Sequence, residues 1–138
     1  MSWSGLSALV LAAGVAGVNV NVADITADGL TVKKLSCTLD SGGLFASALV
    51  VGALAKEKTA LDACAPTGAA VELKWTWSGG KASKATATRA SSPKKAGCVV
   101  AAVMSVPAPT NGSCQAIVLV GEGEAAAAAV DQMKPVAK

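Results

Sequence analysis

The sequence has no histidine and no tyrosine among its 138 residues. Histidine is the commonest general base and the commonest metal ligand in proteins, and tyrosine is a frequent proton donor. The nine acidic residues are scattered and never form the spaced aspartate run of a calcium-binding loop. We therefore predict that the protein is not an enzyme, and we expect no cofactor, no metal site and no small-molecule substrate.

Charge is also scarce, at 15% of residues with a net charge of +3, and aromatic residues make up only 3%. The lysines occur singly or in pairs, without the basic stripe that nucleic-acid binding requires, so we expect no nucleic-acid partner. Hydrophobic residues make up 52% of the chain, a high share for a protein of this length. A surface so poor in charge favours burial against a protein partner or against copies of the same chain.

The chain has four cysteines and no C-x-x-C motif, which argues against a zinc or redox site. An even number of dispersed cysteines in a small domain is typical of two structural disulfides formed in an oxidising compartment. The alternative is four buried thiols that act as small hydrophobic residues. Disulfides would place the protein in the periplasm, the cell envelope or the extracellular space.

The N-terminal segment is apolar, and we assign residues 1–23 to it. Residues 6–18 match the length of a secretory signal core, although no Lys or Arg precedes them, and they are short for a membrane span. If the segment is retained, it packs against its own domain or a neighbouring subunit, or it contacts a membrane. The residues predicted to make such contacts are Trp3, Leu6, Leu9 and Val10.

Alternating apolar and polar residues predict strands at residues 17–25 and 30–39, with a bulge at the Lys33–Lys34 pair. A β-hairpin is expected over residues 71–90 around Gly79 and Gly80, and a last strand over residues 113–121. Helical spacing predicts helices at residues 44–65, at residues 94–106 after Pro93, and at residues 124–133.

This order of elements predicts an α+β fold in which an antiparallel sheet carries two helices on one face, as in a split βαβ arrangement. We assign residues 24–121 to a single domain and residues 122–138 to an Ala-rich helical tail. Trp75 and Trp77 lie on the same face of one predicted strand. They either pack in the core or form a platform for a partner, and we take them as candidate partner contacts.

Four stretches carry a resemblance to a known family. They are "LDAC" from Leu61, "VELKWTWSGGKASKATATRASS" from Val71, "AGCVVAAVMSVPAP" from Ala96 and "GSCQAIVLV" from Gly112. Together, residues 60–121 resemble the C-terminal domain of TonB-type proteins, in particular the cysteine-bearing versions of myxobacterial envelope proteins. The family's aromatic residue before P-x-P is Val106 here.

The resemblance implies a non-enzymatic module that binds short segments of partner proteins by adding a strand at an open sheet edge. The alternative function is a self-assembling structural subunit, in a filament or surface assembly, that uses the apolar N-terminus.

The split βαβ topology also predicts the disulfide pairing. Cys37, late in a rising strand, and Cys114, early in the neighbouring descending strand, lie at the same end of the sheet. Cys64 at the end of one helix and Cys98 early in the next lie together at the other end. The predicted bridges are therefore Cys37–Cys114 and Cys64–Cys98, because a Cys37–Cys64 bridge would span the length of a helix.

Overall fold

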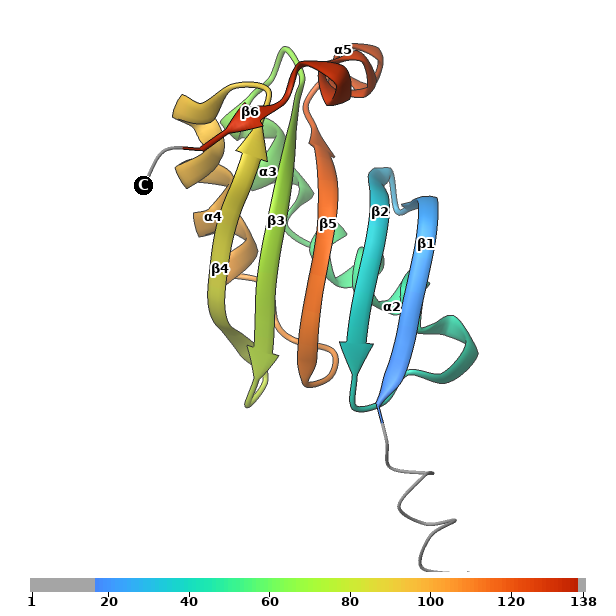
Figure 1. Cartoon of the computed structure of the whole chain (residues 1–138). Helices are drawn as coiled ribbons and strands as arrows, with labels where there is room; N and C mark the ends of the chain where they lie inside the picture. Colours follow the sequence, from blue (N-terminus) through green and yellow to red (C-terminus); the bar gives the residue numbers. More distant parts are fainter. Residues whose placement is uncertain (1–16, 137–138) are drawn as a thin grey trace, which may run out of the picture.

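The computed structural model describes residues 17–136, and Figure 1 shows their arrangement. The sheet is antiparallel throughout, in the order β1-β2-β5-β3-β4-β6. Its strands are β1 (Val18–Ala27), β2 (Leu30–Leu39), β3 (Ala69–Ser78), β4 (Lys81–Ala90), β5 (Gly112–Val120) and β6 (Lys134–Pro135). The α+β class predicted from the sequence is confirmed. The domain boundary drawn after residue 23 falls inside β1 and divides a continuous strand.

The two tight turns follow from local sequence. Asp28 and Gly29 join β1 to β2 with φ angles of 50° and 82°, and Gly79 and Gly80 join β3 to β4 with φ angles of 64° and 84°. Such left-handed pairs match the twist of a two-residue hairpin. The predicted bulge is confirmed, because the register of β2 against β5 shifts in the stretch from Lys33 to Ser36.

The predicted helix over residues 44–65 is wrong as a single element. It consists of η1 (Gly43–Phe45), α2 (Ala46–Ala55) and α3 (Lys58–Cys64), with a break at Lys56 and Glu57. α2 packs beneath β1 and β2, whereas α3 packs against β5 and α4 (Ala96–Met104). The change of direction at the break lets each segment bury its apolar residues against a different part of the sheet.

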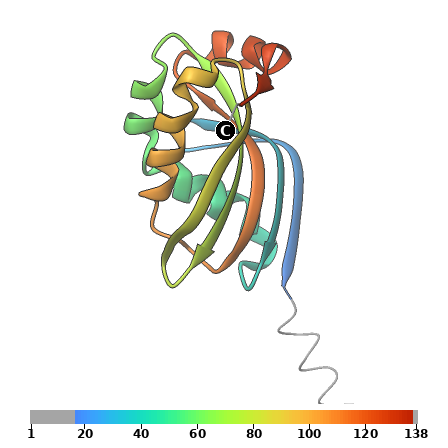
Figure 2. The same ribbon diagram turned by 60° about the vertical axis from the view of Figure 1, so that its left-hand side comes forward.

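The prediction of two helices on one face is not confirmed, because three helices lie there. α2, α3 and α4 cover one face of the sheet, as the turned view in Figure 2 shows. α5 (Gly123–Ala129), followed by η3 (Val130–Gln132), lies against the other face. There Ala126 and Ala129 pack on Ala70, Ile117 and Leu119, which point away from the other helices. The Ala-rich tail is therefore helical as predicted, and it packs because β3 and β5 present apolar residues on their outer face.

The main core lies between the sheet and α2, α3 and α4, and it is built mostly from Val, Leu and Ala. Both disulfides form with the predicted pairing. Cys37 lies directly opposite Cys114 with a Cα–Cα distance of 4.1 Å, and Cys64 bonds Cys98 with a Cα–Cα distance of 5.6 Å. Two disulfides fit an oxidising location outside the cytoplasm.

Candidate interaction site

The first edge of the sheet is open. β1 is ten residues long and pairs with β2 along one side. No strand within residues 17–136 pairs with its other side. Alternate backbone N–H and C=O groups along that side therefore face outward, which makes β1 a template for a further strand.

The opposite edge is covered at both ends. β6 pairs with β4 at Arg89 and Ala90, and the Val136 N–H donates to the Thr88 carbonyl at 3.1 Å. At the other end of β4, Lys81 forms a bridge with Pro107, and the neighbouring Ala108 N–H donates to the Gly80 carbonyl at 2.9 Å. Strand addition is therefore favoured at β1.

β1 has few of the features that usually protect an edge strand. Lysines and prolines on the edge are common protections, and β1 has neither. Its single charged residue is Asp24, whose Oδ2 lies 3.1 Å from Lys33 Nζ on β2. The ion pair directs this charge over the outer face of the sheet, and the row of backbone groups stays accessible.

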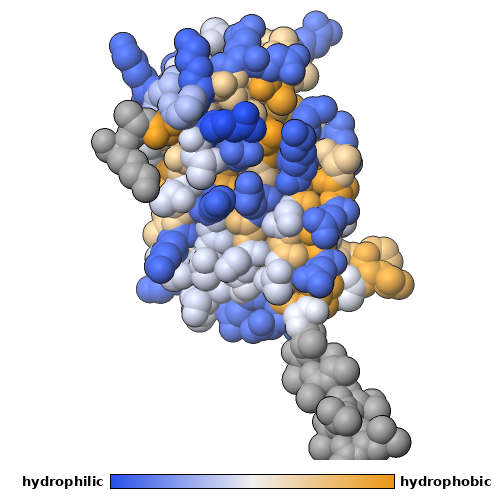
Figure 3. Space-filling view, in the orientation of Figure 1, coloured by the Kyte–Doolittle hydropathy of each residue, from blue (hydrophilic) through white to orange (hydrophobic). Residues whose placement is uncertain are grey.

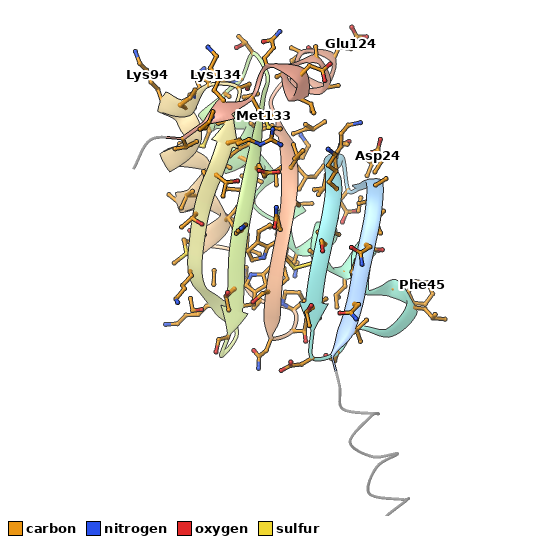
Figure 4. All side chains as sticks on the ribbon, viewed as in Figure 1. Asp24, Phe45, Lys94, Glu124, Met133 and Lys134 are labelled. Atoms are coloured by element: carbon orange, nitrogen blue, oxygen red, sulfur yellow. A yellow bond between two sulfur atoms is a disulfide. The ribbon has the colours of Figure 1, made fainter. Side chains whose placement is uncertain are left out.

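An apolar ridge lies beside this edge on the helical side, where η1 and α2 pass β1. It consists of Leu44, Phe45 and Leu49, which are 96%, 78% and 41% exposed. Figure 4 shows Phe45 pointing away from the body beyond β1, and the same projection is hydrophobic in Figure 3. Leu44 was predicted as the first residue of a helix, and it lies instead in η1, before α2 begins.

Two glycines direct the chain into this ridge. Gly42 has φ 141° and Gly43 has φ 60°, conformations that L residues with a side chain rarely adopt. A Cβ atom on Gly42 would lie 2.9 Å from the Cβ of Ala46. The glycines thus turn the chain sharply after β2, so that Leu44 and Phe45 project outward and Ala46 begins α2 as a buried residue.

The outer face of the sheet below α5 is polar and slightly hollowed. The hollow has a volume of about 410 Å³, and its outward side chains come from β2, β5, β3 and β4. They are Ser36, Thr38, Ser113, Gln115, Lys74, Thr76, Lys84 and Thr86. Most of these side chains are short and hydroxylated, and Cys37, Trp75 and Cys114 line the floor of the hollow.

Two carboxylates near this face have lowered pKa values. Glu72 accepts hydrogen bonds from Arg89 Nε at 3.1 Å, from Arg89 Nη2 at 3.2 Å and from the Thr88 hydroxyl at 2.8 Å. The Arg89 hydrogen bond is the main cause that lowers the pKa of Glu72, and burial opposes it. At the start of α5, the backbone N–H groups of Ala125 and Glu124 lower the pKa of Glu122. These groups stabilise the fold.

The predicted contact residues do not come together at this site. Trp75 and Trp77 are 2% and 1% exposed and pack edge to face in the core, with ring centroids 5.8 Å apart. Their prediction as partner contacts is wrong, because β3 is a central strand and its tryptophan face lies under the helices. The other predicted contact residues lie outside the described residues; they are Trp3, Leu6, Leu9 and Val10.

No prediction from the sequence covered the apolar ridge, and the resemblance implied an open sheet edge without identifying it as β1. Phe45 is the only phenylalanine of the chain, and it follows Leu44 directly after a Gly-Gly pair. Two large apolar residues directly after a Gly-Gly pair were the available indication of exposed hydrophobic side chains. The identity of the open edge had no local indication, because it depends on which strands pair.

Within residues 17–136, no helix is long and apolar enough to cross a membrane, and no group of three or more His, Cys, Asp or Glu side chains could hold a metal ion. Comparison of the chain with protein-family models, curated proteins and solved structures finds no match. The candidate site therefore consists of the β1 edge and the apolar ridge, identified from their geometry.

Proposed function

We propose that the chain is a non-enzymatic protein–protein interaction module of the cell envelope or extracellular space. It resembles a TonB-type C-terminal domain and binds its partner as an added strand along β1. The observation that supports this most is the ten-residue edge strand with one charged residue and no lysine or proline. The two disulfides support a location in an oxidising compartment.

In strand addition, backbone hydrogen bonds contribute affinity, and side chains at alternate positions select the partner. On β1, the helix-facing Val18, Val22 and Ile25 are half-buried. A strand added beside them would extend the sheet over the apolar ridge. The partner segment is therefore extended and carries apolar residues on the side that faces Phe45.

Site-specific photo-cross-linking in the full chain tests this proposal. A benzoylphenylalanine residue at Asn21, exposed on β1, is expected to cross-link a partner protein in native cells. The same residue at Thr86, exposed on the outer face of β4, is the matched control and is expected to give no such product. Equal products from both positions, or none from Asn21, would contradict the proposal.

Hydrogen exchange on the purified complex supplies the second measurement. Strand addition protects backbone amides in residues 18–27, because N–H groups that face water in the free protein become hydrogen-bonded. The amides of residues 81–88 in β4 serve as the internal reference and are expected to keep their exchange rates. A partner that protects β4 and leaves β1 unchanged would move the site to the other edge.

The second candidate is the self-assembling structural subunit, which the exposure of Leu44 and Phe45 favours. Sedimentation of the full chain separates the two candidates, because a large ordered particle supports the structural subunit. Deleting residues 1–16, which precede β1, is expected to abolish that assembly if the apolar N-terminus drives it. Assembly that is unchanged after the deletion would exclude this role of the N-terminus.

A further inference from the structure

We infer that the strand added at β1 is β1 of a second copy, which forms a two-fold symmetric dimer with one continuous antiparallel sheet. The inference rests on the proposed function, since it names the partner of the same edge. Three observations carry it: the side-chain pattern of β1, the position of the apolar ridge, and the closure of the opposite edge.

The side-chain pattern of β1 reads nearly the same in both directions. Val18, Val20 and Val22 face the helices in the first half of the strand, whereas Ile25 and Ala27 do so in the second half. Both Ala23 and Asp24 are exposed, so the alternation changes phase at the middle of the strand. If a ten-residue strand alternated perfectly, pairing two copies antiparallel about their centres would place each helix-facing residue opposite an outward-facing one. The reason is that an even number of residues puts opposite positions out of step by one residue, which exchanges the two faces.

Because the alternation of β1 changes phase at its middle, opposite residues face the same side of the sheet everywhere in the paired strands except at the central pair. When two copies of β1 pair about their common centre, Val20 lies opposite Ile25 of the second copy, and both face the helices. On the outer face, Asn21 lies opposite Asp24 of the second copy. The amide of Asn21 can then donate a hydrogen bond to that carboxylate, and no two like charges face each other.

The apolar ridge supports the same pairing. η1 follows the end of β2, which pairs with the start of β1 through Val18 and Leu39. Phe45 therefore projects past the first half of β1 on the helical side, as Figure 4 shows. A two-fold axis through the centre of β1 places this ridge beneath Ile25 and Ala27 of the second copy, which are half-buried in the single chain. Each copy thus covers the most exposed large hydrophobic side chains of the described residues.

The opposite edge explains why the assembly stops at two copies. β4 is covered by β6 at one end and bridged by Pro107 at the other, and it carries Lys81 and Lys84. An interface that uses the same surface on both copies closes on itself, and each β4 edge is interrupted at both ends. The inference therefore predicts a dimer and excludes a filament built through β1.

Sedimentation velocity on the full chain over a wide concentration range is the first test. The mass is expected to rise from 13.4 kDa to twice that value. Phe45→Glu is expected to raise the dimer dissociation constant at least about thirtyfold, as for a central apolar contact. Met104→Glu changes a residue on α4 that is 40% exposed and serves as the matched control. It is expected to change the dimer dissociation constant by less than about twofold.

Covalent trapping tests the register. Oxidation of a mixture of Asn21→Cys and Asp24→Cys chains is expected to give a linked dimer, whereas either variant alone gives little. The four native cysteines are all in bridges and do not compete. Circular dichroism of each variant confirms folding, which is expected because Asn21, Asp24 and Phe45 are exposed in the single chain.

Several outcomes would overturn the dimer. The first is a monomer at every concentration. The second is a dimer that Phe45→Glu does not weaken and that gives no cross-link between the Asn21→Cys and Asp24→Cys chains. The third is co-sedimentation of the full chain with phosphatidylcholine vesicles that is lost in the Phe45→Glu variant. A monomer would assign the ridge to another occupant, such as the chain's own residues 1–16 or a lipid surface. None of these results would refute the proposed function, which fails if Asn21 cross-links no protein or if Thr86 gives the same product.

Discussion

Trp75 on β3 lies directly opposite Cys114 on β5, and Cys114 forms a disulfide with Cys37 on β2, the neighbouring strand on the other side of β5. The central three strands are therefore joined by backbone pairing, a covalent bridge and a buried aromatic side chain at one level of the sheet. This level lies beneath α2, α3 and α4 and is part of the main core. The open edge strand β1 lies outside these three strands and pairs with β2 alone.

The two disulfides are expected to contribute unequally to stability. Cys37 and Cys114 are separated by 77 residues and Cys64 and Cys98 by 34, so the first bridge constrains the unfolded chain more. Paired Cys→Ala variants should each lower the free energy of unfolding by about 2–5 kcal/mol, with the Cys37–Cys114 pair larger by about 0.7 kcal/mol. Urea unfolding measures both. Peptide mapping without reduction is the control, and a Cys37–Cys64 or Cys98–Cys114 peptide would contradict the pairing.

The buried Trp77 is expected to tolerate replacement by phenylalanine better than replacement by alanine. Among the described residues, neither Trp75 Nε1 nor Trp77 Nε1 has a hydrogen-bond partner, although both are buried. Trp77→Ala should lower the free energy of unfolding by about 3–5 kcal/mol, because it leaves a large cavity. Trp77→Phe removes the unpaired N–H, which itself costs about 1–3 kcal/mol, and keeps most of the ring volume. Urea unfolding should show a loss for Phe less than half of that for Ala; equal losses would contradict this account.

The pair of Glu72 and Arg89 is expected to make stability depend on pH. The pKa of Glu72 is lowered in the folded protein, first by the hydrogen bond from Arg89. A carboxyl with a lowered folded pKa stabilises the protein above its ordinary pKa, and that stabilisation is lost as the pH falls through the lowered value.

Glu72→Gln tests this dependence. The variant should be less stable than the native chain by about 1 kcal/mol at neutral pH, and the gap should close at acid pH. Thermal unfolding at a series of pH values measures the gap. Glu57→Gln, on the connection between α2 and α3, is the control variant. A gap that stays constant down to acid pH would mean that the Glu72 charge is not the source.

Two glycines are expected to respond in opposite directions to the same change. Gly121 has φ 78°, and a Cβ atom there would overlap the Ala65 carbonyl oxygen. Gly121→Ala should cost more than about 3 kcal/mol or prevent folding. Gly97 lies in α4 with no atom near its missing Cβ, so Gly97→Ala should stabilise the protein by up to about 1 kcal/mol. Thermal unfolding compares the two, and a neutral Gly121→Ala would contradict the close packing there.

Much of the local structure was predictable from the sequence because it depends on neighbouring residues. The alternation around Val20 and Val22 predicted a strand, the Gly79–Gly80 pair predicted the hairpin, and the Lys33–Lys34 pair predicted the bulge. The disulfide pairing also followed, since the order of the elements determines which strands and helix ends are neighbours. The strand, the hairpin and the bulge are each a property of one segment or of the connection between two, whereas the disulfide pairing depends on the predicted topology.

The candidate site was decided by tertiary structure. The same alternation suits a central strand and an edge strand, so nothing in β1 itself reveals that its second side is unpaired. Tryptophans such as Trp75 and Trp77 are common at binding surfaces, yet here the helices of the main core cover them. The apolar spacing over residues 44–65 predicted one helix, whereas packing against two parts of the sheet divides it and leaves Phe45 exposed. The sequence alone determined which segments form strands and helices, and only the pairing of distant strands decided which edge and which apolar side chains remain free to bind.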